Sequence, residues 1–144
     1  MKHRYLKDPQ WYGAFVLAIV VWVLIHLFVE ASNPQNLFAM PQIILISVIL
    51  YPLLEEIVFR GMLQGQLMAR PAFRIRFLGL SRANFLTSII FSGLHLFYQP
   101  PLMAALIIFP SLVFGYFRDR HRTVVPSIYL HAFYNLGFLT LFAN

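Results

Sequence analysis

A pair of adjacent glutamates and a nearby arginine lie in an apolar part of the chain, where charge needs an explanation. They are Glu55, Glu56 and Arg60. On a helix, Glu56 and Arg60 are four residues apart in the order that favours an ion pair, whereas Glu55 points about 100° away. Arg60 can therefore neutralise Glu56, while Glu55 needs another partner or a proton. A carboxyl group in an apolar segment with no cation of its own is suited to act as a general base near neutral pH.

Two further patterns supply histidines and an asparagine. His95 ends the run that begins at Phe91, and His131 precedes Asn135 by four residues. His131 and Asn135 therefore project from one face of a helix, and both side chains can donate hydrogen bonds. Polar groups are costly inside a membrane, so we expect the groups of all three patterns to meet in one site. A purely structural role in helix-to-helix hydrogen bonding is the alternative for each of them.

Apolar segments must position these groups. The chain has 144 residues, of which 60% are hydrophobic and 11% are charged. Soluble domains carry about 25% charged residues, so an ordinary globular domain is excluded. The sequence predicts an all-α, polytopic membrane helix bundle that forms a single membrane domain over residues 1–144. Its five candidate spans, of which the third and fourth are short, cover residues 11–29, 42–63, 83–98, 102–117 and 124–142.

The eleven Lys and Arg residues are distributed unevenly along the chain. They precede the first span, lie at or after the end of the second, or separate the fourth from the fifth. Because cytoplasmic loops are rich in Lys and Arg, we expect a cytoplasmic N-terminus and an external C-terminus. Topology and lipid headgroups explain the net charge of +6, so no nucleic-acid partner is expected. The mixed basic and apolar stretch 70–82 is a candidate for lying along the cytoplasmic membrane surface.

The first apolar run, residues 11–29, follows a basic N-terminus, as the apolar part of a secretory signal does. It is longer than the roughly 7–15 residues of such a signal, and Val29-Glu30-Ala31 is a poor cleavage site. We therefore expect a retained membrane span. The chain contains no cysteine, which excludes disulfides and thiolate metal sites.

Helix rise gives an expected depth for each candidate. Glu55 and His131 lie about 12 Å and 10 Å from the cytoplasmic ends of their spans, whereas His95 lies about 18 Å from the start of its span. His95 reaches the same depth only if its span begins later or is tilted. Pro52 either kinks the second span and opens room for water or marks the start of that helix, and Pro110 offers the same choice in the fourth span.

The three patterns, in this order and each in an apolar helix, resemble the motifs of the CPBP family. This family comprises the CAAX proteases and bacteriocin-processing enzymes and is also called the Abi family. Residues 55–60 match E-E-x-x-x-R, residues 91–95 match F-x-x-x-H, and residues 131–135 match H-x-x-x-[N/D]. The resemblance covers a protease-like core of about residues 45–140. The span at residues 11–29 is an addition at the N-terminus.

The resemblance implies a glutamic intramembrane endopeptidase that hydrolyses a peptide bond of a membrane-associated protein or peptide. Carried over by motif position, Glu55 would activate the attacking water with assistance from His95. His131 and Asn135 would form the oxyanion hole that stabilises the tetrahedral intermediate. The expected partners are the lipid bilayer and a membrane-embedded or lipid-anchored substrate.

The same resemblance gives Glu56 and Arg60 the role of a supporting ion pair, in agreement with their spacing. No cofactor is expected in this scheme. The alternative is a zinc-dependent protease in which Glu55, His95 and His131 are the ligands and a fourth position is open. We favour the metal-free scheme because asparagine is an ordinary oxyanion donor and a poor zinc ligand.

Two other functional classes remain as alternatives. A proton-coupled transporter also contains buried Glu and His, although such proteins usually show internal repeats and this sequence shows none. A non-catalytic immunity protein would keep the fold without turnover. The compact chain resembles bacterial members of the family, so we expect an integral protein of the bacterial inner membrane.

Overall fold

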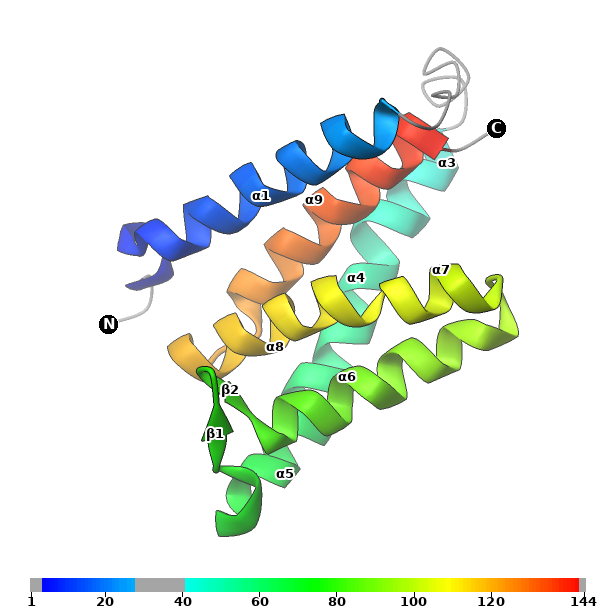
Figure 1. Ribbon diagram of the computed structural model, residues 1–144. Helices are drawn as coiled ribbons and strands as arrows, with labels where there is room; N and C mark the ends of the chain where they lie inside the picture. Colours follow the sequence, from blue (N-terminus) through cyan, green and yellow to red (C-terminus); the bar gives the residue numbers. More distant parts are fainter. Residues whose placement is uncertain (1–3, 28–40, 143–144) are drawn as a thin grey trace. The chain divides into compact units, whose positions relative to one another are not determined.

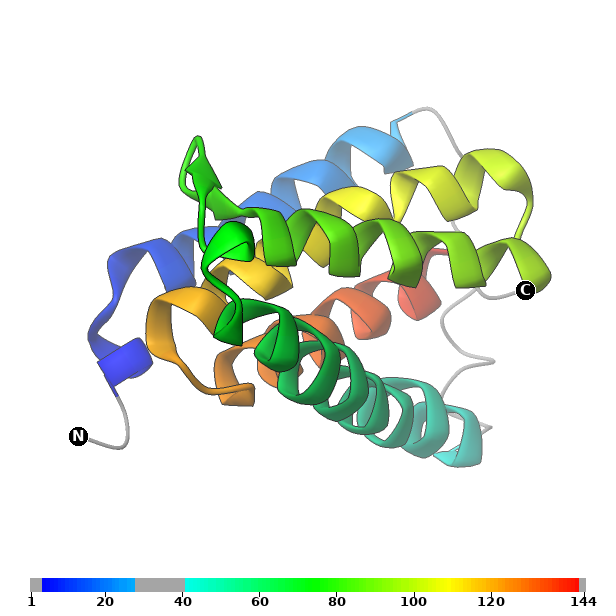
Figure 2. The same ribbon diagram turned by 90° about the horizontal axis from the view of Figure 1, so that it is seen from below.

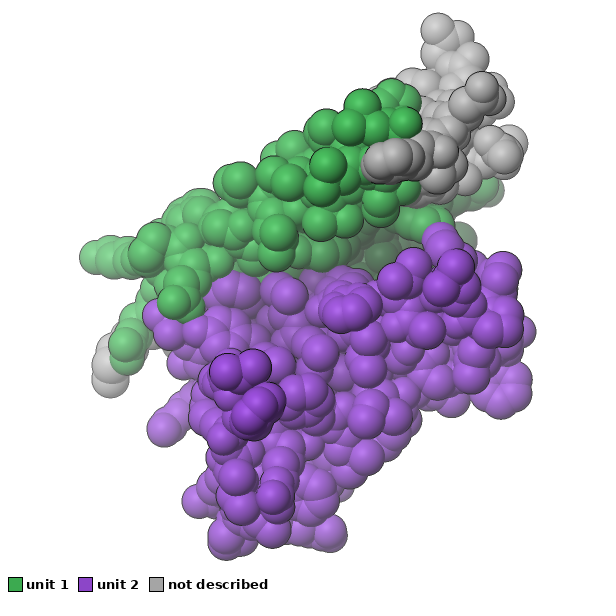
Figure 3. Space-filling view, in the orientation of Figure 1, with its two compact units in different colours: residues 1–54, 128–144 green, residues 55–127 purple. Residues whose placement is uncertain are grey.

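The computed structural model describes residues 4–27 and 41–142. The chain divides into two compact units, of which one contains residues 1–54 and 128–144 and the other contains residues 55–127 (Figure 3). We call them unit 1 and unit 2. One long helical stretch contributes to both units, and the single membrane domain stays a prediction.

Helices make up most of the described chain (Figure 1). After a 3₁₀ turn, η1, at Arg4–Lys7, helix α1 covers Pro9–His26. The next helical stretch runs without interruption through α3 (Pro41–Ile44), the π-helical segment η2 (Leu45–Leu50), α4 (Tyr51–Glu56), the π-helical segment η3 (Ile57–Leu63) and α5 (Gln64–Ala69). The remaining elements are the 3₁₀ turn η4 (Pro71–Phe73), strands β1 (Arg76–Phe77) and β2 (Leu80–Ser81), α6 (Arg82–Leu94), the 3₁₀ turn η5 (His95–Phe97), α7 (Pro101–Leu106), α8 (Ile108–His121) and α9 (Val125–Phe142).

Each of the five expected spans coincides with helical structure, and the prediction of an all-α membrane helix bundle is confirmed. Three stretches are long and apolar enough to cross a membrane, namely Pro9–His26, Pro41–Ala69 and Pro101–His121. Helix α6 is shorter, with 13 residues. Residues 28 and 29 of the first span, and residues 30–40 of the connection that follows, lie outside the described residues. The orientation in the membrane stays a prediction.

A short β-hairpin interrupts the helices within the stretch 70–82. Strands β1 and β2 are antiparallel, with Phe77 opposite Leu80. The loop residues Leu78 and Gly79 have φ angles of 50° and 82°, and positive φ at both positions matches the twist of a two-residue hairpin. Glycine adopts this conformation freely, whereas leucine does so only against steric resistance. The location of this stretch on the membrane surface stays a prediction.

Two prolines have different effects on their helices. Pro110 lies in the first turn of α8. Because proline has no N–H, it cannot bond to the carbonyl of Leu106, the residue at which the preceding helix α7 ends. Pro52 lies inside the uninterrupted stretch Pro41–Ala69, directly after a π-helical segment. The interpretation of Pro52 as the start of a helix was therefore wrong.

In unit 1, α1 and α9 lie side by side (Figure 1). They pack against each other through aromatic rings. The rings of Trp22 and Phe133 have centroids 4.9 Å apart. The Tyr134 hydroxyl donates a hydrogen bond of 3.1 Å to the Ala14 carbonyl. A Cβ atom at Gly137 would lie 2.1 Å from the Trp22 ring, so only glycine fits at this crossing.

In unit 2, α6 packs along α8 (Figure 1, Figure 2). A Cβ atom at Gly115 would lie 1.9 Å from Oδ1 of Asn84, so the glycine lets α8 approach this side chain. Nδ2 of Asn84 donates to the Leu112 carbonyl at 2.9 Å. The Ser92 hydroxyl donates to the Ala104 carbonyl at 2.5 Å. The Asn84 contact thus holds α6 against α8, and the Ser92 contact holds α6 against α7.

Candidate active site

The two adjacent glutamates on α4 have different surroundings. Glu56 is fully buried and forms an ion pair with the equally buried Arg60, with 3.3 Å between Oε2 and Nε. Glu55 is only half-buried. The helical spacing that favours a Glu56–Arg60 pair thus produces one in the structure. The two carboxylates differ in their access to a substrate or a water molecule.

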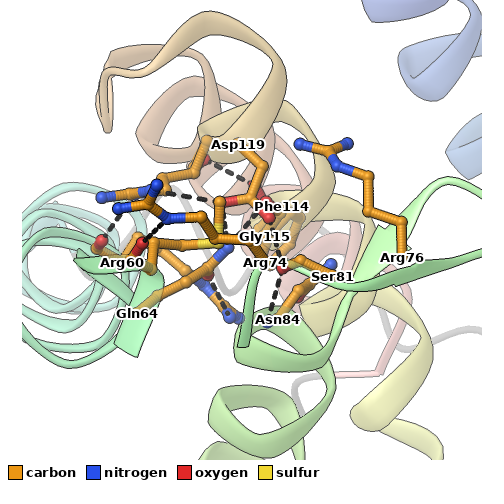
Figure 4. A network of polar contacts seen from close by, with 12 residues as sticks. Arg60, Gln64, Arg74, Arg76, Ser81, Asn84, Phe114, Gly115 and Asp119 are labelled. Carbon is orange, nitrogen blue, oxygen red and sulfur yellow. Dashed lines mark hydrogen bonds and ion pairs between the residues drawn. The ribbon is translucent and has the colours of Figure 1, made fainter. Parts of the chain in front are cut away.

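Further polar side chains enclose Arg60 (Figure 4). Its Nη1 donates to Oε1 of Gln64 at 3.3 Å, and its Nη2 donates to the Ser111 hydroxyl at 2.6 Å. The Ser88 hydroxyl lies 3.5 Å from Nη1. A buried guanidinium needs both a counter-ion and hydrogen-bond acceptors, because desolvation costs several kcal/mol for each ion. Helices α5, α6 and α8 therefore supply the acceptors that surround the ion pair.

Asp119 is a second centre in the same set of contacts. Its carboxylate is buried and accepts hydrogen bonds from the Ser81 hydroxyl at 2.5 Å and from Nε2 of Gln64 at 2.9 Å. Nη1 of Arg118 lies 3.2 Å from the same carboxylate. The Gln64 amide therefore bridges Arg60 and Asp119, with its oxygen facing the cation and its nitrogen facing the anion. We call the whole set the Arg60 network, with members Glu56, Arg60, Gln64, Ser81, Ser88, Ser111, Arg118 and Asp119.

Sequence reasoning missed the part of this network that lies beyond the ion pair. One signal was present, because Gln64 follows Arg60 by four residues and so shares a helix face with it. A second signal was Asp119, one of only 5 acidic residues in the chain, placed among basic residues at the end of α8. No spacing rule joins Asp119 to Gln64, which lies 55 residues away.

His95 follows α6 in the 3₁₀ turn η5 and is half-buried. Its Nδ1 lies 2.8 Å from the carbonyl oxygen of Phe91, four residues earlier. A carbonyl can only accept a hydrogen bond, so Nδ1 carries a proton, and in the neutral imidazole Nε2 is then an acceptor. Helix α6 begins at Arg82, so a later start of the helix does not explain the depth of His95.

The ring of Phe91 joins His95 to the Arg60 network. Its centroid lies 4.7 Å from that of the His95 ring and 5.6 Å from Cζ of Arg60. Phe59 packs against the same ring edge-to-face at 5.0 Å. A guanidinium over an aromatic face gains about 0.5–2 kcal/mol, more when it is desolvated. Phe91 thus orients the imidazole with its carbonyl and covers the buried cation with its ring.

The other two candidates lie on α9 in unit 1. His131 is buried, and Asn135 is half-buried. Nδ2 of Asn135 donates a hydrogen bond of 2.9 Å to the carbonyl oxygen of Ser47. Ser47 belongs to the π-helical segment η2. The Asn135 amide is therefore anchored to the backbone of the long helical stretch within the same unit.

The candidates are divided between the two units. Glu55 and His95 belong to unit 2, whereas His131 and Asn135 belong to unit 1. The meeting of these four residues in one site stays a prediction. Among the residues that the structure describes, no three His, Cys, Asp or Glu side chains are grouped as metal ligands within reach of each other. The zinc alternative requires the same meeting of side chains from both units.

Comparison with known proteins identifies the family. The family model described as "Type II CAAX prenyl endopeptidase Rce1-like" matches residues 38–137, which are 100 of the 144 residues. The match contains all three polar patterns and leaves α1 outside, as expected. Searches of curated proteins and of solved structures gave no significant match. The chain belongs to the type II CAAX prenyl endopeptidase Rce1-like family and is a membrane-embedded peptidase.

Proposed function

We propose that the protein hydrolyses a peptide bond of a lipid-anchored substrate by direct attack of a water molecule that Glu55 activates. The contrast between the two adjacent glutamates carries this proposal. Glu56 is enclosed together with Arg60, and its protonation would leave a buried cation without its nearest counter-ion. Glu55 is half-buried on the same helix, a position from which a carboxylate can exchange a proton with water.

His95 assists through Nε2 in this scheme. Because Nδ1 donates to the Phe91 carbonyl, Nε2 can accept a hydrogen bond from the attacking water or from protonated Glu55. The water proton passes to this pair as the water oxygen bonds to the substrate carbonyl carbon. The pair then returns the proton to the leaving amine as the carbon–nitrogen bond breaks. No covalent acyl-enzyme forms.

His131 and Asn135 stabilise the oxyanion. They lie four residues apart on α9, so one helix face presents both donors. The Asn135 amide has two N–H groups, and the one that does not bond to Ser47 can donate to the developing negative charge. Removal of one oxyanion donor lowers kcat by about 10²–10³-fold in other proteases.

The family match supports a substrate with a prenylated cysteine close to its C-terminus. The prenyl chain would lie in the bilayer and hold the adjacent peptide bonds at the enzyme. We propose that the enzyme cleaves at that cysteine and requires no cofactor. A location in the bacterial inner membrane stays a prediction.

The test is cleavage of fluorogenic peptides with a prenylated cysteine by the purified protein in detergent, with and without a chelator. We expect turnover that survives chelation and shows no trapped acyl-enzyme in mass spectrometry. Loss of turnover with chelator and its recovery with zinc would instead support the zinc alternative. A covalent acyl-enzyme would contradict direct attack by water. Absence of cleavage together with proton-coupled flux in liposomes would support the transporter.

A further inference from the structure

The Ser47 carbonyl in the long helical stretch lacks an N–H donor both at the spacing of an α-helix and at the spacing of a π-helix. The N–H of Tyr51 bonds to the carbonyl of Ile46, five residues earlier, and not to Ser47, its partner in a regular α-helix. At the spacing of a π-helix, the donor to Ser47 would be residue 52. Residue 52 is Pro52, which has no N–H. The end of the π-helical segment therefore leaves the Ser47 carbonyl to another partner.

Asn135 is that partner, with 2.9 Å between its Nδ2 and the Ser47 carbonyl oxygen. Inside a membrane, a backbone group freed by proline is satisfied by a neighbouring helix, because lipid offers no hydrogen bond. The contact also fixes the Asn135 amide. The carbonyl can only accept, so the NH₂ group and not the oxygen of Asn135 faces it.

We propose that Pro52 is a positioning residue for Asn135, acting through the Ser47 carbonyl. The inference rests on the proposed role of Asn135 as an oxyanion donor. An amide with one N–H anchored to a helix holds its second N–H in a fixed direction. Fixed donors stabilise an oxyanion better than donors that must reorganise during the reaction. The π-helical segment is thus part of the catalytic apparatus, in line with the frequent occurrence of such segments at functional sites.

The substitution Pro52→Ala tests this directly, because it supplies the missing N–H. If the helix returns to α-spacing, the Tyr51 N–H bonds to Ser47. If the π-spacing persists, the new N–H at position 52 does so. In both cases Asn135 must share the carbonyl. We expect kcat to fall roughly tenfold or more with KM within about twofold, since binding is not altered.

Stability distinguishes this effect from simple damage to the fold. Removal of a proline from a helix interior restores a hydrogen bond, so the thermal midpoint of Pro52→Ala should be equal to or above that of the wild type. A merely structural proline would give a change in stability with unchanged kcat. The matched control is Pro110→Ala in α8, which should keep kcat within about twofold of the wild type.

The variant Asn135→Ala separates the two levels of the proposal. Full activity in Asn135→Ala would overturn the oxyanion role itself. Impaired activity in Asn135→Ala with a wild-type kcat in Pro52→Ala would overturn only the positioning role. If both hold, the double variant should be no slower than Asn135→Ala by more than about twofold, because the two changes remove one interaction.

A spectroscopic measurement tests the contact without any substrate. In protein labelled with ¹⁵N-asparagine, the side-chain signal of residue 135 is identified by its loss in Asn135→Ala. We expect one proton of that amide to exchange slowly with solvent in the wild type and rapidly in Pro52→Ala. Identical exchange in the two proteins would overturn the inference.

Discussion

The two π-helical segments of the stretch Pro41–Ala69 present polar groups in opposite ways. The first, Leu45–Leu50, contains no charged residue and offers a backbone carbonyl to Asn135. The second, Ile57–Leu63, carries Arg60, whose side chain is enclosed by Glu56, Gln64 and serines of α6 and α8. Polar groups enclosed on all sides hold a unit together. A side chain that is anchored by one hydrogen bond, as Asn135 is, can still donate a second hydrogen bond to a substrate.

The largest loss of stability is expected from a substitution at the centre of the Arg60 network. Arg60→Ala would leave Glu56 buried without its counter-ion and would open space under the Phe91 ring. Loss of one partner of a buried ion pair typically costs about 3–5 kcal/mol. We expect the free energy of unfolding in mixed micelles to fall by about that amount. A change below about 1 kcal/mol would show that the pair contributes no more than exposed ones do.

The second prediction concerns the far end of the same region. Asp119→Asn keeps the shape of the side chain but removes the charge that faces Arg118. It also replaces one of the two carboxylate oxygens, which accept separately from Ser81 and from Gln64, by an NH₂ group that cannot accept. Hydrogen bonds to charged groups contribute about 1.5–3 kcal/mol each, so we expect a loss of about 2 kcal/mol in unfolding free energy. The double variant Asp119→Asn with Gln64→Ala is measured alongside. If it loses the same unfolding free energy as Asp119→Asn alone, the Gln64 bridge acts through Asp119.

Much of the fold followed from the sequence because a membrane helix needs a long apolar run, and such runs are visible without coordinates. The Glu56–Arg60 pair was also predictable, since both residues lie on one helix within one turn. The π-helical segments were not, because their composition is that of an ordinary helix and only Pro52 hinted at one. The hairpin was equally hidden, since Leu78 opposes the residue preferences of its turn.

The candidate site divides in the same way. Local spacing identified the residues of the three motifs, and the family match covers them. The Gln64–Asp119 contact joins residues 55 positions apart, and no periodicity announces it. The protonation of His95 at Nδ1 and the Asn135–Ser47 hydrogen bond depend on backbone carbonyls, whose positions only coordinates reveal.

A smaller loss of stability is expected at Gly115, where the close approach of two helices, and not a charge, supports the Arg60 network. Gly115→Ala would place a methyl group 1.9 Å from Oδ1 of Asn84, so α6 and α8 must move apart. Overpacking of this kind costs about 1–3 kcal/mol. Gly13→Ala in α1 is the matched control, because a Cβ there meets nothing within 4 Å. Equal midpoints for the two variants in thermal unfolding would contradict the close packing at Gly115.

The smallest effect on stability is expected for a substitution at the tip of the β-hairpin, which lies outside both π-helical segments. Leu78 is 86% exposed, and Phe77 beside it is 70% exposed, in a stretch that also carries Arg74 and Arg76. We expect this tip to enter the membrane interface. Because the chain has no cysteine, Leu78→Cys can carry a single fluorophore. Brominated lipids should quench it, whereas a fluorophore quenched only by aqueous iodide would place the tip in water.

The most direct test compares the two glutamates in one experiment. Glu55→Gln and Glu56→Gln are each measured for thermal unfolding and for cleavage of the prenylated peptide. We expect Glu55→Gln to keep the wild-type midpoint while kcat falls about 10²–10⁴-fold, the usual contribution of a general base. We expect Glu56→Gln to lower the midpoint, because Arg60 loses its counter-ion. Near-normal kcat in Glu55→Gln, at any stability, would contradict the assignment of Glu55 as the catalytic base.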